Sequence, residues 1–124
     1  MTKKVLLSVF AGIIILGGGL FILLKNKGEE PTIGQGIILF YGTGCPHCAK
    51  VEEYLQANNI ESKINIEKKE VYNNKDNANL LAKIEKKCGI KENELGVPFL
   101  WTGSECKIGD EDIINFFKEK VQKQ

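Results

Sequence analysis

The pattern of apolar and polar residues predicts one long apolar segment followed by a small domain. Residues 5–24 (VLLSVFAGIIILGGGLFILL) contain no charged side chain, and lysines flank them on both sides. A helix of this length spans about 30 Å, the thickness of the hydrocarbon core of a bilayer. The pattern therefore predicts a transmembrane anchor over residues 1–24. A cleavable signal peptide fits less well, because its apolar core would be shorter and no small-residue cleavage site follows.

The rest of the chain divides into a polar linker and a domain with regular apolar spacing. Residues 25–36 (KNKGEEPTIGQG) are polar and contain glycines and a proline, which is typical of a flexible tether. Residues 37–124 form the predicted domain. Its first segment, the apolar run over residues 37–41, is bounded by glycines and predicts a central strand covered on both faces.

The remaining elements follow from the spacing of apolar residues. Intervals of three and four predict helices over residues 46–58 and 74–88, and a last helix with Asp110 as its N-cap. Alternation predicts a strand over residues 63–71, and two short strands around a turn at 102–105 predict a β-hairpin. The domain is therefore expected to be α/β, with the order β-α-β-α-β-β-α and a four-stranded mixed sheet.

Charge and cysteine content narrow the range of partners and compartments. The chain has 17 basic residues, all of them lysines, against 16 acidic residues. The lysines are spread among glutamates, and no cluster of basic and aromatic residues indicates nucleic-acid binding. Four cysteines in so small a domain suit an oxidising compartment. We therefore expect a single-pass membrane protein whose domain lies outside the cytoplasm.

The candidate chemistry lies where the first predicted strand ends. Cys45-Pro46-His47-Cys48 follows a glycine-containing loop and opens the first predicted helix. Pro46 suits the first helical position. Cys45 would then be the N-cap, where unpaired N–H groups and the helix dipole favour the reactive thiolate. Cys48 lies one turn later, close enough to resolve a mixed disulfide on Cys45, and His47 adds positive charge or a hydrogen bond.

Two other roles are open to a Cys-x-x-Cys pair. A zinc site would need two more ligands, but Cys88 and Cys106 stand alone in the sequence, and the single histidine lies inside the pair. A passive structural disulfide is also possible, although so short a ring is usually redox-labile. The strand, glycine loop and helix around the pair favour a redox-active dithiol and no metal. His47 as a merely solvated residue stays an alternative to a tuning role.

The arrangement resembles the thioredoxin fold in its minimal, glutaredoxin-like form. The resemblance covers about residues 36–122 and rests on three segments: Tyr41 to Cys48, Val97-Pro98 before the third strand, and Ile108-Gly109-Asp110 before the last helix. It implies a cis peptide bond before Pro98 and a Val97–Pro98 backbone that faces the cysteines and binds the extended segment of a substrate. An ordinary trans proline that starts an edge strand is the alternative.

The Cys-Pro-His-Cys sequence is similar to that of bacterial thiol oxidases of the cell envelope. The resemblance implies that Cys45 is the nucleophile, that Cys48 is the resolving thiol, and that Pro46 and His47 tune the pair toward a strongly oxidising disulfide.

The chain departs from its apparent relatives at three places. Glutaredoxins usually have a lysine that helps to hold glutathione where this chain has Gly42, and paired glycines where it has Gly109-Asp110. Thioredoxins usually have a tryptophan at the position of Gly44. The departures at Gly42 and Gly109-Asp110 argue against glutathione as the preferred partner.

The remaining cysteines, Cys88 and Cys106, lie in the resembled fold at the end of the sheet opposite the active site. A structural disulfide between them is expected, because exported thiols tend to pair. Two buried thiols are the alternative, and a relay role for either one would require a long movement.

These expectations together indicate a membrane-anchored thiol–disulfide oxidoreductase that exchanges disulfides with cysteine-containing proteins through Cys45 and Cys48, without a cofactor. Family analogy suggests a quinone-linked membrane oxidase of the vitamin K epoxide reductase type as its recycling partner. The alternatives are an envelope reductase, a glutaredoxin-like protein, a non-catalytic thioredoxin-like module that binds peptides at Val97–Pro98, and a metal carrier.

Overall fold

The structure is a computed structural model and describes residues 33–124. The predicted anchor over residues 5–24 and most of the predicted tether lie outside the described residues. Among residues 33–124, no helix is long and apolar enough to cross a membrane.

The described residues form four strands, three α-helices and two short 3-10 helices, in the order that the sequence predicts. The strands are β1 (Ile37–Tyr41), β2 (Ile66–Glu70), β3 (Phe99–Trp101) and β4 (Cys106–Ile108). The helices are α2 (Pro46–Ala57), α3 (Lys75–Lys87) and α4 (Gly109–Gln122), with η1 (Ile60–Ser62) and η2 (Glu92–Glu94) between elements. The expected β-α-β-α-β-β-α order is therefore confirmed.

One mixed sheet organises the domain, with the strand order β2-β1-β3-β4. β1 pairs in parallel with β2 and antiparallel with β3, and β3 pairs antiparallel with β4. β1 is therefore central, which explains its uninterrupted apolar sequence. This topology is the glutaredoxin-like one that the sequence resemblance implies.

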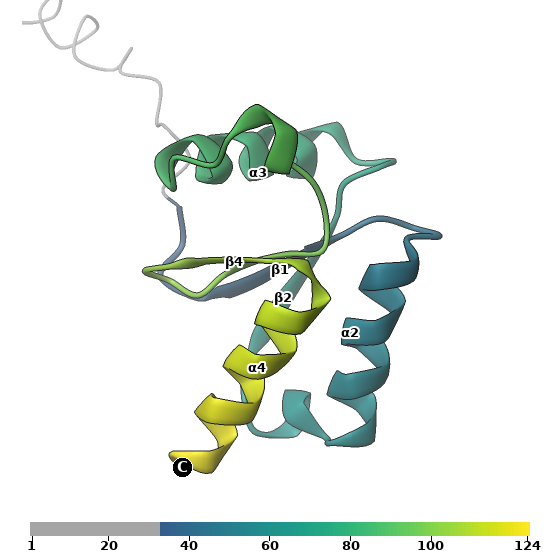
Figure 1. The fold of residues 1–124 in the computed structure, drawn as a ribbon, viewed down its shortest axis with the longest axis vertical. Helices are drawn as coiled ribbons and strands as arrows, with labels where there is room; N and C mark the ends of the chain where they lie inside the picture. Colours follow the sequence, from purple (N-terminus) through teal and green to yellow (C-terminus); the bar gives the residue numbers. More distant parts are fainter. Residues whose placement is uncertain (1–32) are drawn as a thin grey trace, which may run out of the picture. The chain divides into compact units, whose positions relative to one another are not determined.

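The helices cover the two faces of the sheet, with α2 and α4 on one face and α3 on the other (Figure 1). Leu39 and Leu100 pack on the first face with apolar residues of α2 and α4, such as Phe117. Phe40 and Phe99 pack on the second face with residues of α3. Each fully buried Leu or Phe side chain contributes about 1.5–3 kcal/mol to stability. The core therefore fixes the end of β1 against the start of α2.

The two outer strands of the sheet carry charge. Four of the five residues of β2 are charged, in the sequence IEKKE. β4 has three residues and places Lys107 beside Glu105 at 3.1 Å.

The predicted N-cap of the last helix is wrong. α4 begins at Gly109, and its N-cap is Ile108, whose side chain makes no capping hydrogen bond. β4 leads directly into α4, so Ile108 keeps an extended backbone and Gly109 adopts a positive φ of 82°. Glycine reaches this conformation without steric cost. Asp110 therefore lies in the first turn of α4 rather than before it.

A disulfide joins α3 to β4. Cys88 is the C-cap of α3, Cys106 is the first residue of β4, and the two are 18 positions apart in the chain. A covalent link across this separation limits the conformations of the unfolded chain and so stabilises the fold.

Replacing both cysteines, in Cys88→Ala/Cys106→Ala, should lower the free energy of unfolding by about 3 kcal/mol, the chain-entropy value for a loop of this order. Urea unfolding under non-reducing conditions would measure the change. Cys45→Ala/Cys48→Ala is the matched control, and its loss should be smaller, because that disulfide closes a separation of only 3 residues. Equal stability of the first variant and the wild type, or alkylation of Cys88 in protein purified in air, would contradict the expectation.

Candidate active site

The site forms where β1 gives way to α2. The loop turns within a few residues: the Cys45 N–H donates a hydrogen bond to the Gly42 carbonyl oxygen at 3.2 Å, and Gly44 adopts a φ of +80°. Cys45 has an extended backbone and is the N-cap of α2, as the sequence predicts, with Pro46 as the first helical residue. The buried strand β1 and the helix α2 thus place Cys45 at the N-terminus of the helix.

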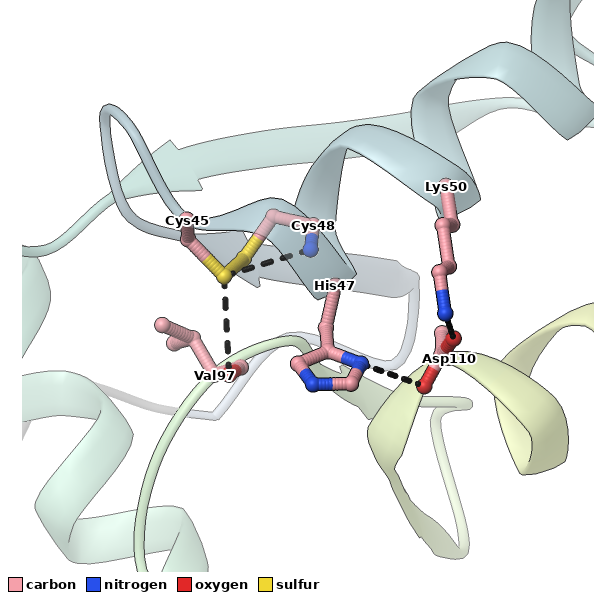
Figure 2. Close-up of polar contacts among 6 residues, drawn as sticks. All are labelled: Cys45, His47, Cys48, Lys50, Val97 and Asp110. Atoms are coloured by element: carbon pink, nitrogen blue, oxygen red, sulfur yellow. Dashed lines mark hydrogen bonds and ion pairs between the residues drawn. A yellow bond between two sulfur atoms is a disulfide. The ribbon is translucent and has the colours of Figure 1, made fainter.

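Cys45 and Cys48 form a disulfide at this N-terminus. The Cys48 N–H also donates a hydrogen bond to the Cys45 Sγ at 3.2 Å (Figure 2). Cys48 is buried, with 7% of its surface exposed, whereas Cys45 is partly exposed. The first turn of α2 contains no acidic residue. An incoming thiolate can therefore reach the sulfur of Cys45 more readily than that of Cys48.

The segment before β3 lies against the cysteine pair. The Val97–Pro98 peptide bond is cis, as the resemblance implies. The carbonyl oxygen of Val97 is 3.8 Å from the Cys45 Sγ, and the Pro98 carbonyl accepts a hydrogen bond from the Gly109 N–H at 3.0 Å. A disulfide sulfur has no proton to donate, but a reduced Cys45 thiol at this distance could donate one to Val97. The structure thus brings together Cys45, Cys48, Val97 and Pro98.

A groove of about 560 Å³ adjoins the disulfide. Cys45, Cys48 and Pro98 line it, together with Glu52 of α2 and Lys68 of β2. The Lys68 Nζ lies 2.8 Å from Glu52 and 2.8 Å from Glu61. Partial burial opposes the charged form of Lys68, but the hydrogen bonds to the two glutamates raise its pKa; the hydrogen bond from Lys68 lowers the pKa of Glu52 despite burial. Both groups therefore stay charged and connect α2 to β2 beside the groove.

His47 lies in the first turn of α2 and turns toward α4. Its Nδ1 is 3.1 Å from the Asp110 carboxylate, which also pairs with the Lys50 Nζ at 3.4 Å (Figure 2). Desolvation alone would raise the pKa of Asp110, but hydrogen bonds from its own N–H, Lys50 and His47 together lower it. In the described part of the chain, the hydrogen-bond partner of the His47 ring is Asp110 rather than Cys45.

A carboxylate at the end of β2 holds the loop that carries the cysteines. Glu70 accepts hydrogen bonds from the N–H and the hydroxyl of Thr43, and from the N–H groups of Tyr72 and Asn73. The hydrogen bond from Asn73 is the largest cause that lowers the pKa of Glu70, and those from Thr43 and Tyr72 add to it against desolvation. The same turn places the Tyr72 ring over Gly42, so a side chain at position 42 would require the exposed Tyr72 ring to move.

Sequence reasoning missed the charged residues that hold the site. Asp110 was expected to cap α4, and Glu70 carries no sequence signal apart from the turn that follows it. Glu85, which accepts the Gly96 N–H in the loop before Pro98, could have been noticed in the sequence. It lies four residues after Leu81 and therefore on the apolar side of α3, where a carboxylate is unusual. Among residues 33–124, no group of three or more His, Cys, Asp or Glu residues is placed to hold a metal ion.

Glu70 should make the stability of the domain depend on pH. Because its pKa is lower in the folded state, the carboxylate stabilises the fold above its ordinary pKa of 4.5, and this contribution is lost as the pH falls through the lowered value. Glu70→Gln should therefore have a lower thermal midpoint than the wild type at pH 7, and the gap should narrow as the pH falls below 4.5. Glu53→Gln, at an exposed position of α2, is the control and should show no gap. A gap for Glu70→Gln that is independent of pH would contradict this role.

Comparisons with known proteins do not assign this chain to a family. No protein-family model matches the sequence, and no curated protein matches it significantly. Among solved structures, the chain is similar to oxidized glutaredoxin 2 from Chlamydomonas reinhardtii, with 19% identity and a TM-score of 0.49, over 71% of this chain and 76% of that chain. At this level of similarity, the glutaredoxin-like assignment depends on the strand order and connections of the domain itself.

Proposed function

We propose that this protein is a thiol–disulfide oxidoreductase that exchanges disulfides with cysteine-containing proteins through Cys45 and Cys48. The observation that carries the proposal is the position of Cys45. Its sulfur caps α2, accepts the Cys48 N–H at 3.2 Å and lies next to the cis Val97–Pro98 segment. N–H groups at a helix N-terminus stabilise a thiolate, which is both the nucleophile and the leaving group in disulfide exchange.

In the oxidising direction, a substrate thiolate attacks the Cys45 Sγ. The bond between Cys45 and Cys48 breaks, and its electron pair stays on Cys48, which takes up a proton. A second substrate thiolate then attacks the substrate sulfur of the mixed disulfide and expels Cys45 as a thiolate. The substrate has lost two electrons and gained a disulfide, and the cysteine pair is reduced.

The reverse sequence reduces a substrate disulfide: Cys45 attacks, and Cys48 resolves the mixed disulfide. The reduction potential of the pair decides the direction. The Cys-Pro-His-Cys sequence favours oxidation or isomerisation, by resemblance to the envelope thiol oxidases.

We further propose that residues 5–24 anchor the protein in a membrane and that the domain works outside the cytoplasm, in the cell envelope. The uncharged segment supports the anchor, and the use of four cysteines supports the oxidising compartment. A quinone-linked membrane oxidase of the vitamin K epoxide reductase type would re-oxidise the pair, by family analogy.

Two variants should separate the roles of the cysteines. Cys45→Ser should abolish oxidation of a reduced test peptide, because the sulfur open to attack is gone. Cys48→Ser, mixed instead with an oxidised, disulfide-containing peptide, should accumulate a mixed disulfide on Cys45, because Cys45 can attack the peptide disulfide but the resolving thiol is gone. Mass spectrometry of the trapped adduct and a thiol-oxidation assay would measure both. Cys88→Ala/Cys106→Ala is the control and should keep the exchange reaction. Exchange that survives in Cys45→Ser would refute the proposal and leave a peptide-binding module.

His47 should tune the potential of the pair. Pro46→Gly/His47→Pro removes the imidazole and should make the pair more reducing by at least about 30 mV, which is a tenfold change in the equilibrium constant of a two-electron couple. Equilibration with glutathione would measure the potential, and Glu53→Gln should leave it unchanged. A wild-type value near about −120 mV would indicate an oxidase and one near about −270 mV a reductase. An unchanged potential in the double variant would show that His47 has no tuning role.

A further inference from the structure

Glu85 is an unusual residue in this domain. Among residues 33–124, it is the one charged or polar side chain that is buried, with 5% of its surface exposed. It lies in the last turns of α3, next to Ile84, which is fully buried against the sheet. Burying a carboxylate is unfavourable unless polar partners compensate for the lost water. An apolar residue would be the less costly choice at this position, so the carboxylate needs an explanation.

The carboxylate of Glu85 contacts the loop that leads to the active site. Its Oε1 accepts a hydrogen bond from the Gly96 N–H at 3.1 Å. Burial raises the pKa of Glu85, and the hydrogen bond from Gly96 only partly offsets this effect. Gly96 has a φ of +151°, a conformation that other residues rarely adopt. Glycine reaches this conformation readily, so the Gly96 N–H can point toward the Glu85 carboxylate.

The hydrogen bond between Glu85 and Gly96 is the main polar contact of residues 95–97, a segment that lies next to the Cys45 Sγ. Of the backbone N–H groups of residues 95–97, only that of Gly96 has a hydrogen-bond partner within residues 33–124. Residue 97 follows directly, with its carbonyl oxygen 3.8 Å from the Cys45 Sγ. Its N–H has no partner within the described residues and can pair with an extended substrate chain. Leu95, on the other side of Gly96, is 48% exposed. Without the Glu85 contact, the edge would be held only from its other side, where the Pro98 carbonyl accepts the Gly109 N–H at 3.0 Å.

We infer that Glu85 is a positioning residue for disulfide exchange: it accepts the Gly96 N–H and thereby fixes the Val97 backbone beside Cys45, where an unfolded substrate chain pairs with it. This role rests on the proposed function and adds to it a residue that positions the edge where the substrate binds. The Val97 backbone that Glu85 positions pairs with the backbone of an extended polypeptide. A small dithiol reaches Cys45 without that edge, so Glu85 should control selectivity for unfolded protein over small thiols.

The test compares four oxidised full-length variants with the wild type in single-turnover reactions. Glu85→Met keeps the length of the side chain but has no oxygen acceptor. Glu85→Asp keeps the charge but is one CH₂ too short to reach Gly96. Glu85→Gln keeps the acceptor oxygen without the charge. Lys86→Met, at the next and exposed position of α3, is the matched control. Each is mixed with reduced, unfolded ribonuclease A and, separately, with dithiothreitol, and the loss of the Cys45–Cys48 disulfide is followed.

The selectivity is the rate constant for the unfolded protein divided by that for dithiothreitol. It should fall by about tenfold or more in Glu85→Met and Glu85→Asp, the order expected for the loss of a hydrogen bond to a charged group. The loss should appear as a higher half-saturating concentration of unfolded protein. Glu85→Gln and Lys86→Met should stay within about threefold of the wild type, because the first keeps the acceptor and the second does not touch the loop.

Several outcomes would overturn the inference. One is a selectivity in Glu85→Met and Glu85→Asp that equals that of the wild type. Another is Glu85→Asp behaving like the wild type while Glu85→Gln fails, which would indicate a role of charge alone. An equal loss of both reactions would show a general effect on the fold. If Glu85→Met does not fold, judged by circular dichroism, the contrast between Asp and Gln decides. A wild type that oxidises neither substrate would instead refute the proposed function.

Discussion

The candidate active site depends on a sulfur atom at the start of a helix. Most helices begin with an oxygen-bearing side chain that accepts a backbone N–H of the first turn. Here the Cys45 Sγ takes that place for α2, at 3.2 Å from the Cys48 N–H. The atom that satisfies the helix is thus the atom that reacts, and the buried strand β1 fixes where it lies. A change that moves the end of β1 would disturb structure and chemistry together.

The two segments that flank this sulfur are both held by carboxylates of neighbouring elements. Glu70, at the end of β2, holds the loop before Cys45 through Thr43. Glu85, in α3, holds the loop before Pro98 through Gly96. The two carboxylates differ in environment: hydrogen bonds lower the pKa of Glu70, whereas burial raises that of Glu85. Both loops are thus held by directed polar contacts from a neighbouring element.

Much of the fold could be predicted from the sequence, because strong local patterns determine it. The apolar run of β1 and the cysteine at the start of α2 lie as predicted, and so do the helices and the hairpin. The start of α4 was predicted incorrectly, because an Asp one residue inside a helix looks like a cap when the backbone conformation of the preceding Gly109 is not known. The contacts of Glu70 and Asp110 join residues far apart in the chain, and no local pattern reports such contacts. Glu85 is the exception, because a carboxylate on the apolar face of a predicted helix is unusual and can be noticed in the sequence.

The charged outer strands have a consequence for the proposed exchange of disulfides with unfolded chains. The exposed borders of a sheet offer unpaired backbone to any extended polypeptide, and such contacts lead to aggregation. β2 opposes this with four charged residues out of five, and β4 is only three residues long. An extended substrate chain would therefore find few backbone groups to pair with at β2 or β4. It would pair instead with the Val97–Pro98 segment beside Cys45. Unfolded substrates could thus contact the domain repeatedly without adding strands to its sheet and aggregating with it.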